Sequence, residues 1–159
     1  MTIQIGDKIP HATLNTLKDG VQAVDTDELF AGKKVVLFAV PGAFTPTCSA
    51  KHLPGYAEHL GEFEKRGIEV ACLSVNDAFV MDAWAKSQGV PEGVQMLADG
   101  NGAFTQALGL ELDATAFGMG LRAKRFALYA EDGVVKQLHV EAPGEFKVSA
   151  ADYVLEHLA

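Results

Sequence analysis

The chain has 159 residues, of which 48% are hydrophobic and 21% charged, a composition typical of one globular domain rather than of a disordered protein. Its formal net charge of −8 disfavours binding to nucleic acid or to an anionic membrane surface. Residues 1–14 contain no apolar stretch of the kind found in signal peptides, so we expect a cytoplasmic protein with a single domain over residues 1–159. Two cysteines are too few for a disulfide scaffold, and free or catalytic thiols are expected.

The first half of the chain predicts two strands joined by a helix. Weak alternation before the turn at residues 18–20 indicates short strands and loops. Residues 35–40 are an unbroken apolar run, typical of a strand covered on both faces. A helix is expected to begin near Pro46, with a kink at Pro54. The next strand, residues 68–75, then implies a right-handed crossover onto a parallel sheet.

The second half predicts further strands and helices around a hairpin. The expected elements are a helix capped by Asn76-Asp77 and ending at Gly89, a strand at 94–98, a helix at 102–108, strands at 121–130 and 134–141, and a helix at 149–158. Asp132-Gly133 is a hairpin signal, and Ser149 followed by Asp152 resembles a capping box. Together these elements predict an α/β protein with a mixed central sheet and helices on both faces.

Cys48 lies in the first helical turn after the most apolar strand, the position where open α/β sheets place their sites. Amide N–H groups there stabilise a thiolate, which is the nucleophilic form. A helix terminus contributes only about 0.3–1 kcal/mol, whereas a guanidinium ~4 Å away contributes up to ~4 kcal/mol before desolvation. An arginine beside Cys48 is therefore expected. Strand alternation would put Arg122 and Arg125 on opposite faces, and leaves open which of them faces inward.

Four segments carry a resemblance to a known family. Residues 41–49 read Pro-Gly-Ala-Phe-Thr-Pro-Thr-Cys-Ser, residues 52–55 read His-Leu-Pro-Gly, residues 71–79 read Ala-Cys-Leu-Ser-Val-Asn-Asp-Ala-Phe, and residues 124–126 read Lys-Arg-Phe. Together they resemble the active-site signature of the peroxiredoxins, and most of all the type-5 or plant type II branch. The resemblance implies a thioredoxin-like fold and an antioxidant thiol peroxidase without a cofactor, acting on hydrogen peroxide and alkyl hydroperoxides.

The same resemblance implies a role for each of several side chains. Cys48 is the peroxidatic cysteine, Thr45 orients the thiolate and the peroxide, and Pro41 shields the sulfur from water. Arg125 is the required arginine. Arg122, like Lys124, is interpreted as a solvated charge at a strand edge.

Two further residues are expected to contact the substrate. The backbone N–H of Thr47, with that of Cys48, is expected to stabilise charge on the departing oxygen. Phe117, beside a glycine-containing loop, is expected to wall the substrate pocket. Aromatic residues such as Phe44 and Phe79 are usually core residues in α/β domains. Relatives nevertheless pair through this end of the molecule, so a homodimer is expected.

The second cysteine bears on how the enzyme is recycled. Cys72 lies in the middle of a predicted strand, where a buried structural thiol is favoured over a resolving cysteine. A disulfide needs Cα atoms within about 7 Å, which a mid-strand residue and a helix start rarely satisfy. Animal members of the branch carry a third cysteine near the C-terminus, and residues 147–150 contain none. Recycling is therefore expected through an external thiol, either glutathione with glutaredoxin or thioredoxin.

His52 follows Cys48 by four positions, so a Cys–His pair or a metal site has to be weighed. A packing or hydrogen-bonding role is favoured over general-base catalysis, because a thiolate needs no base. The remaining histidines are dispersed along the chain and give no metal-ligand spacing, so no metal site is expected.

Two rival functions use the same kind of chemistry. A peroxide sensor or a holdase would also need a reactive thiolate, and the sequence leaves that alternative open. A thiol–disulfide oxidoreductase is disfavoured, because the chain contains no Cys-x-x-Cys motif.

Overall fold

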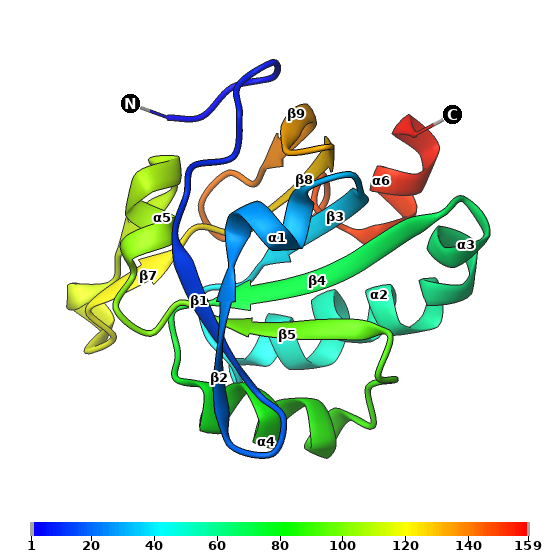
Figure 1. Cartoon of the computed structure of the whole chain (residues 1–159). Coiled ribbons are helices and arrows are strands. Elements are labelled where there is room, and N and C mark those ends of the chain that lie inside the picture. The colour runs from blue at the N-terminus through cyan, green and yellow to red at the C-terminus, as the bar shows by residue number, and fades with distance from the viewer. Residues whose placement is uncertain (1, 159) are drawn as a thin grey trace.

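The structure, a computed structural model, describes residues 2–158 and contains a seven-stranded sheet in the order β2-β1-β5-β4-β3-β8-β9 (Figure 1). Its strands are β1 (Thr13–Leu17), β2 (Val21–Asp25), β3 (Lys34–Ala39), β4 (Ile68–Ser74), β5 (Val94–Ala98), β8 (Phe126–Glu131) and β9 (Val134–Val140). Two short strands, β6 (Glu111–Asp113) and β7 (Leu121–Ala123), pair separately. The helices are α1 (Thr26–Phe30), α2 (Leu53–Glu58), α3 (Leu60–Lys65), α4 (Ala78–Gln88), α5 (Ala103–Leu108) and α6 (Ala151–His157), with a π-helical turn η1 (Cys48–His52) and a 3-10 turn η2 (Thr115–Phe117).

The apolar run at residues 35–40 forms the interior strand β3, as predicted. β3 pairs in parallel with β4 and antiparallel with β8, and β4 pairs in parallel with β5. Every residue of β3 except Lys34 is buried. The sheet is therefore mixed, with its parallel strands in the middle and antiparallel strands at both edges.

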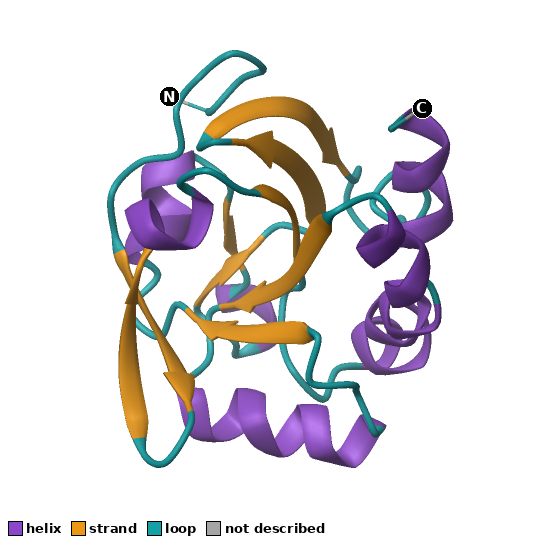
Figure 2. Ribbon diagram, turned by 45° about the vertical axis from the view of Figure 1, so that its right-hand side comes forward, coloured by secondary structure: helices purple, strands orange, loops and turns teal. Residues whose placement is uncertain are grey.

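Alternate residues of β3 face two separate hydrophobic clusters. Val36 and Phe38 belong to the cluster that includes residues of α2, α3, α4 and α6. Val35 and Leu37 belong to the cluster formed with α1 and α5. Figure 2 shows helices on both sides of the sheet, with α4 lying alongside the β1–β2 hairpin. The predicted three-layer α/β arrangement is confirmed.

The helix after β3 begins at Pro46, as predicted, but its second turn is a π turn rather than a simple kink. Pro54 has no N–H and cannot donate to the carbonyl four residues back. The adjacent Leu53 N–H instead bonds to the carbonyl of Cys48, five residues back. This widened turn holds Cys48 and His52 at its two ends.

The caps and the hairpin turn follow the sequence signals. Asp77 Oδ1 accepts from the N–H of Val80 (2.8 Å) at the start of α4, and Gly89 ends that helix with φ 64°. Asp132 and Gly133, with φ of 50° and 77°, form the two-residue turn between β8 and β9. Positive φ at both positions is the reason Asp-Gly is favoured in such turns.

The expected strand at 121–130 is wrong as a single element. The chain bends at Lys124 and Arg125, so residues 121–123 leave the main sheet and pair with β6. The Lys124 N–H donates to the carbonyl of Leu110 (2.8 Å), which fixes the bend. The alternation that placed Arg122 and Arg125 on opposite faces of one strand therefore does not apply.

The expected capping box at Ser149 is also wrong. α6 begins at Ala151, and the Ser149 hydroxyl donates to Glu141 Oε2 (2.6 Å) instead of capping the helix. Asp152 accepts from the N–H of Tyr153 (2.9 Å). The Ser149 hydroxyl thus bonds to a residue that is not part of the helix instead of to the backbone of the first helical turn. Among residues 2–158 no helix has the length and hydrophobicity needed to cross a membrane.

Candidate active site

Cys48 lies just beyond the carboxyl end of β3, at the start of the π turn η1. Its side chain is fully buried and packs in the cluster beneath α2 and α4. Trp84 of α4 donates its indole N–H to the hydroxyl of Ser49, the next residue (2.9 Å). The turn that carries Cys48 is thus fixed by the packing of the Cys48 side chain in the core and by the hydrogen bond from Trp84 of α4.

Arg125 is the arginine that contacts the sulfur. Its Nη2 donates to Cys48 Sγ across 3.0 Å, from the bend between β7 and β8. A cation in such contact contributes up to ~4 kcal/mol to an anion at ~4 Å before desolvation, against ~0.3–1 kcal/mol from a helix terminus. Arg125 is therefore the main stabiliser available to a thiolate at this position.

His52 holds the other side of the same guanidinium. Its Nδ1 lies 2.8 Å from Arg125 Nη1, and its Nε2 lies 3.1 Å from the carbonyl oxygen of Ser149. Burial, assisted by the Arg125 charge, lowers the pKa of His52 to about 3. A neutral imidazole with both nitrogens engaged does not serve as a general base, which leaves His52 the hydrogen-bonding role expected from the sequence.

The loop before Cys48 is held by hydrogen bonds from two directions. The Thr45 hydroxyl donates to the carbonyl of Gly42 (2.7 Å), which leaves its oxygen free to accept a further hydrogen bond. Asn76 Oδ1 accepts from the Ala43 N–H (3.0 Å) and from the Ser74 hydroxyl (2.6 Å). From sequence Asn76 was expected only at the cap of α4, and its hydrogen bonds to this loop were not predicted.

Arg122 is not a solvated charge, contrary to the interpretation from sequence. Its Nε donates to the carbonyl of Met119 (2.9 Å), and its Nη1 lies 3.5 Å from the carbonyl of Pro41. A Cβ at Gly42 would lie 3.1 Å from the same Nη1. Arg122 therefore fastens the β6–β7 loop to the loop before Cys48, and a residue without a Cβ at position 42 leaves room for it.

A cavity of about 220 Å³ is lined in part by Arg125, the residue that contacts the buried sulfur. It is lined by Pro41, Thr47, Leu112, Lys124, Arg125, Glu141, Pro143, Gly144 and Glu145. The structure thus brings Pro41, Thr47 and Arg125 to one cavity. It does not bring Phe117 there, because that side chain is 82% exposed and lies outside the lining of this cavity.

Comparison with known proteins identifies the family. The Redoxin family model matches residues 4–155. Peroxiredoxin-2E, chloroplastic, of Arabidopsis thaliana is 51% identical over 99% of this chain and 70% of its own, and Peroxiredoxin-2B of the same plant is 48% identical over 98% of both chains. The crystal structure of reduced Prx3 from Vibrio vulnificus in complex with hydrogen peroxide is 51% identical, with a TM-score of 0.95 over 99% of this chain and 100% of that one. The chain is a peroxiredoxin.

This peroxiredoxin belongs to the plant type II branch and has the thioredoxin-like fold expected from the sequence. It is a thiol-dependent peroxidase. The family match also explains the mixed sheet, since solved peroxiredoxin structures superpose on nearly the whole chain.

The second cysteine of the peroxiredoxin lies in β4, opposite Phe38 of β3. Cys72 is fully buried, and its burial raises the pKa of the thiol well above the usual value; the nearby Cys48 adds to that effect. Both cysteines are free thiols. A protonated, inaccessible thiol is a poor nucleophile, which agrees with the structural role expected for Cys72.

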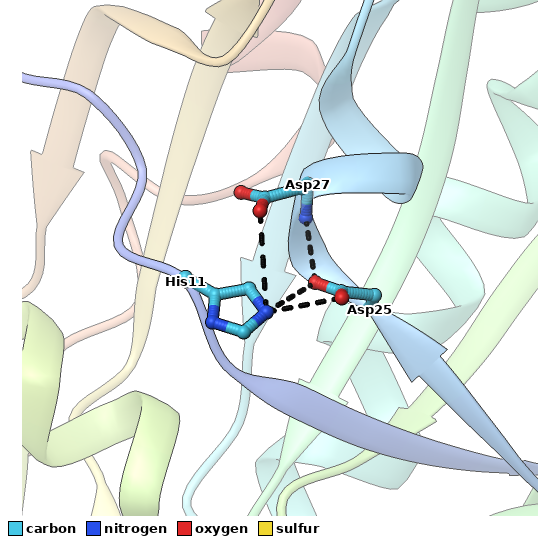
Figure 3. Close-up of side chains that lie close together, drawn as sticks. All are labelled: His11, Asp25 and Asp27. Carbon is cyan, nitrogen blue, oxygen red and sulfur yellow. Dashed lines mark hydrogen bonds and ion pairs between the residues drawn. The ribbon is translucent and has the colours of Figure 1, made fainter.

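Away from the sulfur, one group of side chains within residues 2–158 could share a metal ion, namely His11, Asp25 and Asp27 (Figure 3). No metal site was expected from the sequence, and the spacing of these three residues did not predict that they would lie together. His11 Nε2 lies 2.9 Å from Asp25 Oδ1 and 3.9 Å from Asp27 Oδ2. Asp25 also caps α1 by accepting from the Asp27 N–H (3.1 Å). The three side chains pair with one another at the surface of the peroxiredoxin.

Proposed function

We propose that Cys48 is the peroxidatic cysteine of this enzyme and that Arg125 activates it. The observation that carries the proposal is the 3.0 Å contact from Arg125 Nη2 to Cys48 Sγ at the edge of a cavity. The thiolate attacks one oxygen of the hydroperoxide, the S–O bond forms as the O–O bond breaks, and the departing oxygen takes a proton and leaves as water or alcohol. Cys48 is oxidised to the sulfenic acid, and the peroxide is reduced.

The neighbouring groups take the remaining roles. Two of the five N–H bonds of Arg125 are used by Cys48 and His52, and the others are available to the departing oxygen. The oxygen of Thr45 accepts a hydrogen bond from the peroxide, because its own hydrogen is directed to Gly42. Pro41 and Thr47 line the cavity, where Pro41 limits the access of water and the Thr47 N–H adds a donor.

The substrate class follows from the size and lining of the cavity. A volume of about 220 Å³ admits hydrogen peroxide and small alkyl hydroperoxides. Leu112 and Pro143 provide apolar wall for an alkyl group in the cavity that Arg125 also lines. A peroxide oxygen requires the donors, whereas an alkyl group favours the apolar wall.

We propose that an external thiol recycles Cys48, either glutathione with glutaredoxin or thioredoxin. The thiol displaces water from the sulfenic acid and forms a mixed disulfide, and a second thiol then releases Cys48 and leaves as a disulfide. The burial of Cys72 and the raised pKa of its thiol support an external rather than an internal partner. Both reductants belong to reducing compartments, which agrees with the cytoplasmic location predicted from the sequence.

Replacing each cysteine tests the assignment. Peroxide consumption is measured for Cys48→Ser and Cys72→Ser with glutathione and glutaredoxin, and separately with thioredoxin. Turnover is expected to persist in Cys72→Ser and to disappear in Cys48→Ser. A Cys48–Cys72 disulfide formed quantitatively in the oxidised protein, seen by mass spectrometry, would contradict the external route. A single oxidation without turnover with either reductant would favour the sensor or holdase alternative.

Exposed phenylalanines near the site support a homodimer. Phe44, Phe79 and Phe117 are 55%, 63% and 82% exposed, although aromatic residues are usually buried. Phe44 adopts a φ of 64°, a conformation that non-glycine residues rarely take. The hydrogen bonds of Asn76 and Arg122 connect the loop that carries Phe44 with the residues just before α4, whose first turn carries Phe79, and with the loop that carries Phe117. We propose that a second copy of this chain covers the surface formed by these three phenylalanines. Dimerisation would also place Phe117 at the edge of the active site.

Sedimentation analysis of surface variants tests the dimer. Phe79→Glu and Phe117→Glu are expected to shift the protein to the 16.9 kDa monomer. Val21→Glu, at a 50% exposed apolar residue on the separate β1–β2 hairpin, is the matched control and is expected to leave the mass unchanged. A monomeric parent protein at every concentration contradicts the proposal.

A further inference from the structure

One buried carboxylate near the site has no place in the chemistry described so far. Glu141 follows β9 and is only 8% exposed. Within residues 2–158, no cationic side chain lies within salt-bridge distance of it. An acidic side chain that is buried without a cation must be stabilised by hydrogen bonds.

Those hydrogen bonds all come from one segment of the chain. Glu141 Oε2 accepts from the Lys147 N–H (2.7 Å), the Ser149 N–H (2.8 Å) and the Ser149 hydroxyl (2.6 Å). Burial alone would raise the pKa of Glu141, but the hydrogen bonds from Ser149 and the adjacent amides outweigh it, so the pKa is lowered. The carboxylate therefore holds residues 147–149 in place while it remains ionised.

Ser149 connects this carboxylate to the reactive centre. Its carbonyl oxygen accepts from the Tyr56 hydroxyl (2.7 Å) and is in contact with His52 Nε2 (3.1 Å). A carbonyl oxygen has two lone pairs, so both are used. The position of Ser149, set by Glu141, thus determines where the His52 ring is anchored.

The direction of the next contact is fixed by chemistry. A guanidinium cannot accept a hydrogen bond, so Arg125 Nη1 donates and His52 Nδ1 carries no proton. The proton of the neutral ring is therefore on Nε2, where it is donated to Ser149. His52 is a rigid connector between residue 149 and the guanidinium that contacts Cys48.

Glu141 is also connected with Arg125 directly, through the backbone. The Glu141 N–H donates to the backbone carbonyl of Arg125 (3.0 Å). Phe146, in the segment that Glu141 closes, packs with its ring centroid 5.1 Å from that of His52 and 5.9 Å from Arg125 Cζ. The backbone and the side chain of Arg125 are thus both held by the segment from residue 141 to residue 149.

We propose that Glu141 is a positioning residue for peroxide reduction, whose carboxylate fixes Ser149 and, through His52, orients Arg125 toward Cys48 and the bound peroxide. The inference rests on the proposed role of Cys48 and Arg125. Loss of the carboxylate frees residues 147–149, shifts the anchor of His52 and lets the guanidinium turn away from the departing oxygen. The thiol itself remains in place, because the packing of Cys48 and the bond from Trp84 to Ser49 do not involve Glu141.

The test compares two reactions of the same sulfur. The rate of Cys48 oxidation by hydrogen peroxide, followed by the fluorescence of Trp84, the single tryptophan, is divided by the rate of alkylation by iodoacetamide at the same pH. Both reactions use the thiolate, but only the first uses donors aimed at a departing oxygen. A loss of thiolate lowers both rates and leaves their ratio unchanged. A loss of structure would instead expose the buried Cys48 to iodoacetamide, so the ratio is compared only among variants whose circular dichroism and urea midpoint show that they are folded.

The ratio is expected to fall at least about tenfold in Glu141→Ala, since a misplacement of ~1 Å costs up to ~10²-fold in rate. In Glu141→Gln it is expected to fall about threefold, because a neutral amide oxygen accepts the same hydrogen bonds more weakly. Glu156→Ala, at an exposed position on α6, is the matched control and is expected to keep the parent ratio. The His52 Nε2 proton, observed by NMR, is expected to exchange faster in both Glu141 variants.

A parent-like ratio in folded Glu141→Ala overturns the proposal. If that variant does not fold, Glu141→Gln decides in its place, and a parent-like ratio there overturns the proposal as well. Failure of the proposed function is distinguishable, because a parent protein whose Cys48 ignores peroxide yet reacts with iodoacetamide contradicts the peroxidase assignment itself.

Discussion

Arg125 and Cys48 are 77 positions apart in the chain, and Arg125 Nη2 lies 3.0 Å from Cys48 Sγ. The contact joins the bend between β7 and β8 to the first turn of the helix after β3. Since β3 pairs with β8, the sheet itself brings these two loops to the same edge. The cation that contacts the sulfur is thus brought there by strand pairing rather than by any local motif.

Removing that cation is expected to abolish most peroxide reactivity. Arg125→Ala should lower kcat/KM for hydrogen peroxide by about 10²–10³-fold, the range found when one preorganised donor to a developing anion is lost. Arg125→Lys should recover only part of this loss, because an ammonium cannot contact Cys48 and His52 in the fork geometry of a guanidinium. Lys136→Ala, an exposed cation on β9, is the control. Reactivity within threefold of the parent for Arg125→Ala would count against the assignment.

His52 predicts a loss of stability on the acid side of neutrality. Its pKa is about 3 in the folded protein against 6.5 when exposed, so the unfolded state binds the additional proton between these values. Stability should therefore fall as pH decreases from 6.5 toward 3, by ~1.4 kcal/mol for each unit of the pKa difference. Urea midpoints measured as a function of pH should show a shallower slope in His52→Asn.

Glu141 has a lowered pKa and reduces stability only below pH 4.5. Between pH 6.5 and 4.5 the fall in stability caused by His52 can therefore be measured separately. Burial also lowers the pKa of His139. Its effect on stability is present in both the parent and His52→Asn, so it cancels when their pH slopes are compared. An identical slope in the parent and in His52→Asn would refute the prediction. So would a His52 ring that titrates near 6.5 in the folded protein.

His11 predicts the opposite pH dependence at the surface. The hydrogen bond that His11 donates to the Asp25 carboxylate, followed by the charges of Asp25 and Asp27, raises the pKa of His11 above 6.5 (Figure 3). Its contribution is complete below 6.5 and is lost as pH rises through the folded-state value. His11→Gln should remove this decline, which should also weaken with added salt because the pair is exposed. An NMR titration of His11 with its midpoint at or below 6.5 would contradict this.

Loss of the hydrogen bond between Trp84 and Ser49 should lower the free energy of unfolding. Ser49→Ala leaves the buried indole N–H of Trp84 without its 2.9 Å acceptor, and a buried unpaired donor costs about 1–3 kcal/mol. Ser87→Ala, whose exposed hydroxyl donates to the carbonyl of the same Trp84, is the matched control and should change stability by less than about 0.5 kcal/mol. Equal urea midpoints for the two variants would show that the indole finds another partner.

Several parts of the fold could be predicted because they depend on local physics. The apolar run at 35–40 predicts a buried strand whatever surrounds it, and Asp132-Gly133 predicts its turn because both residues accept positive φ. The bend at Lys124 could not be predicted in this way. Residues 121–130 have one continuous strand-like pattern, and only pairing with β6, itself three residues long, divides them.

The sequence by itself predicted Cys48 as the nucleophile and placed it at a strand-to-helix turn. It also determined the absence of a cysteine in residues 147–150 and the family, because these depend on residue type and near neighbours. The family resemblance also favoured Arg125 over Arg122 as the arginine at the sulfur. Tertiary structure alone decided that Arg122 fastens a loop instead of being a solvated charge, and that Ser149 bonds to Glu141 and His52 instead of capping a helix. The reason is physical: a polar side chain takes whichever partner the packed chain brings within about 3 Å, and residues distant in sequence compete on equal terms with neighbours.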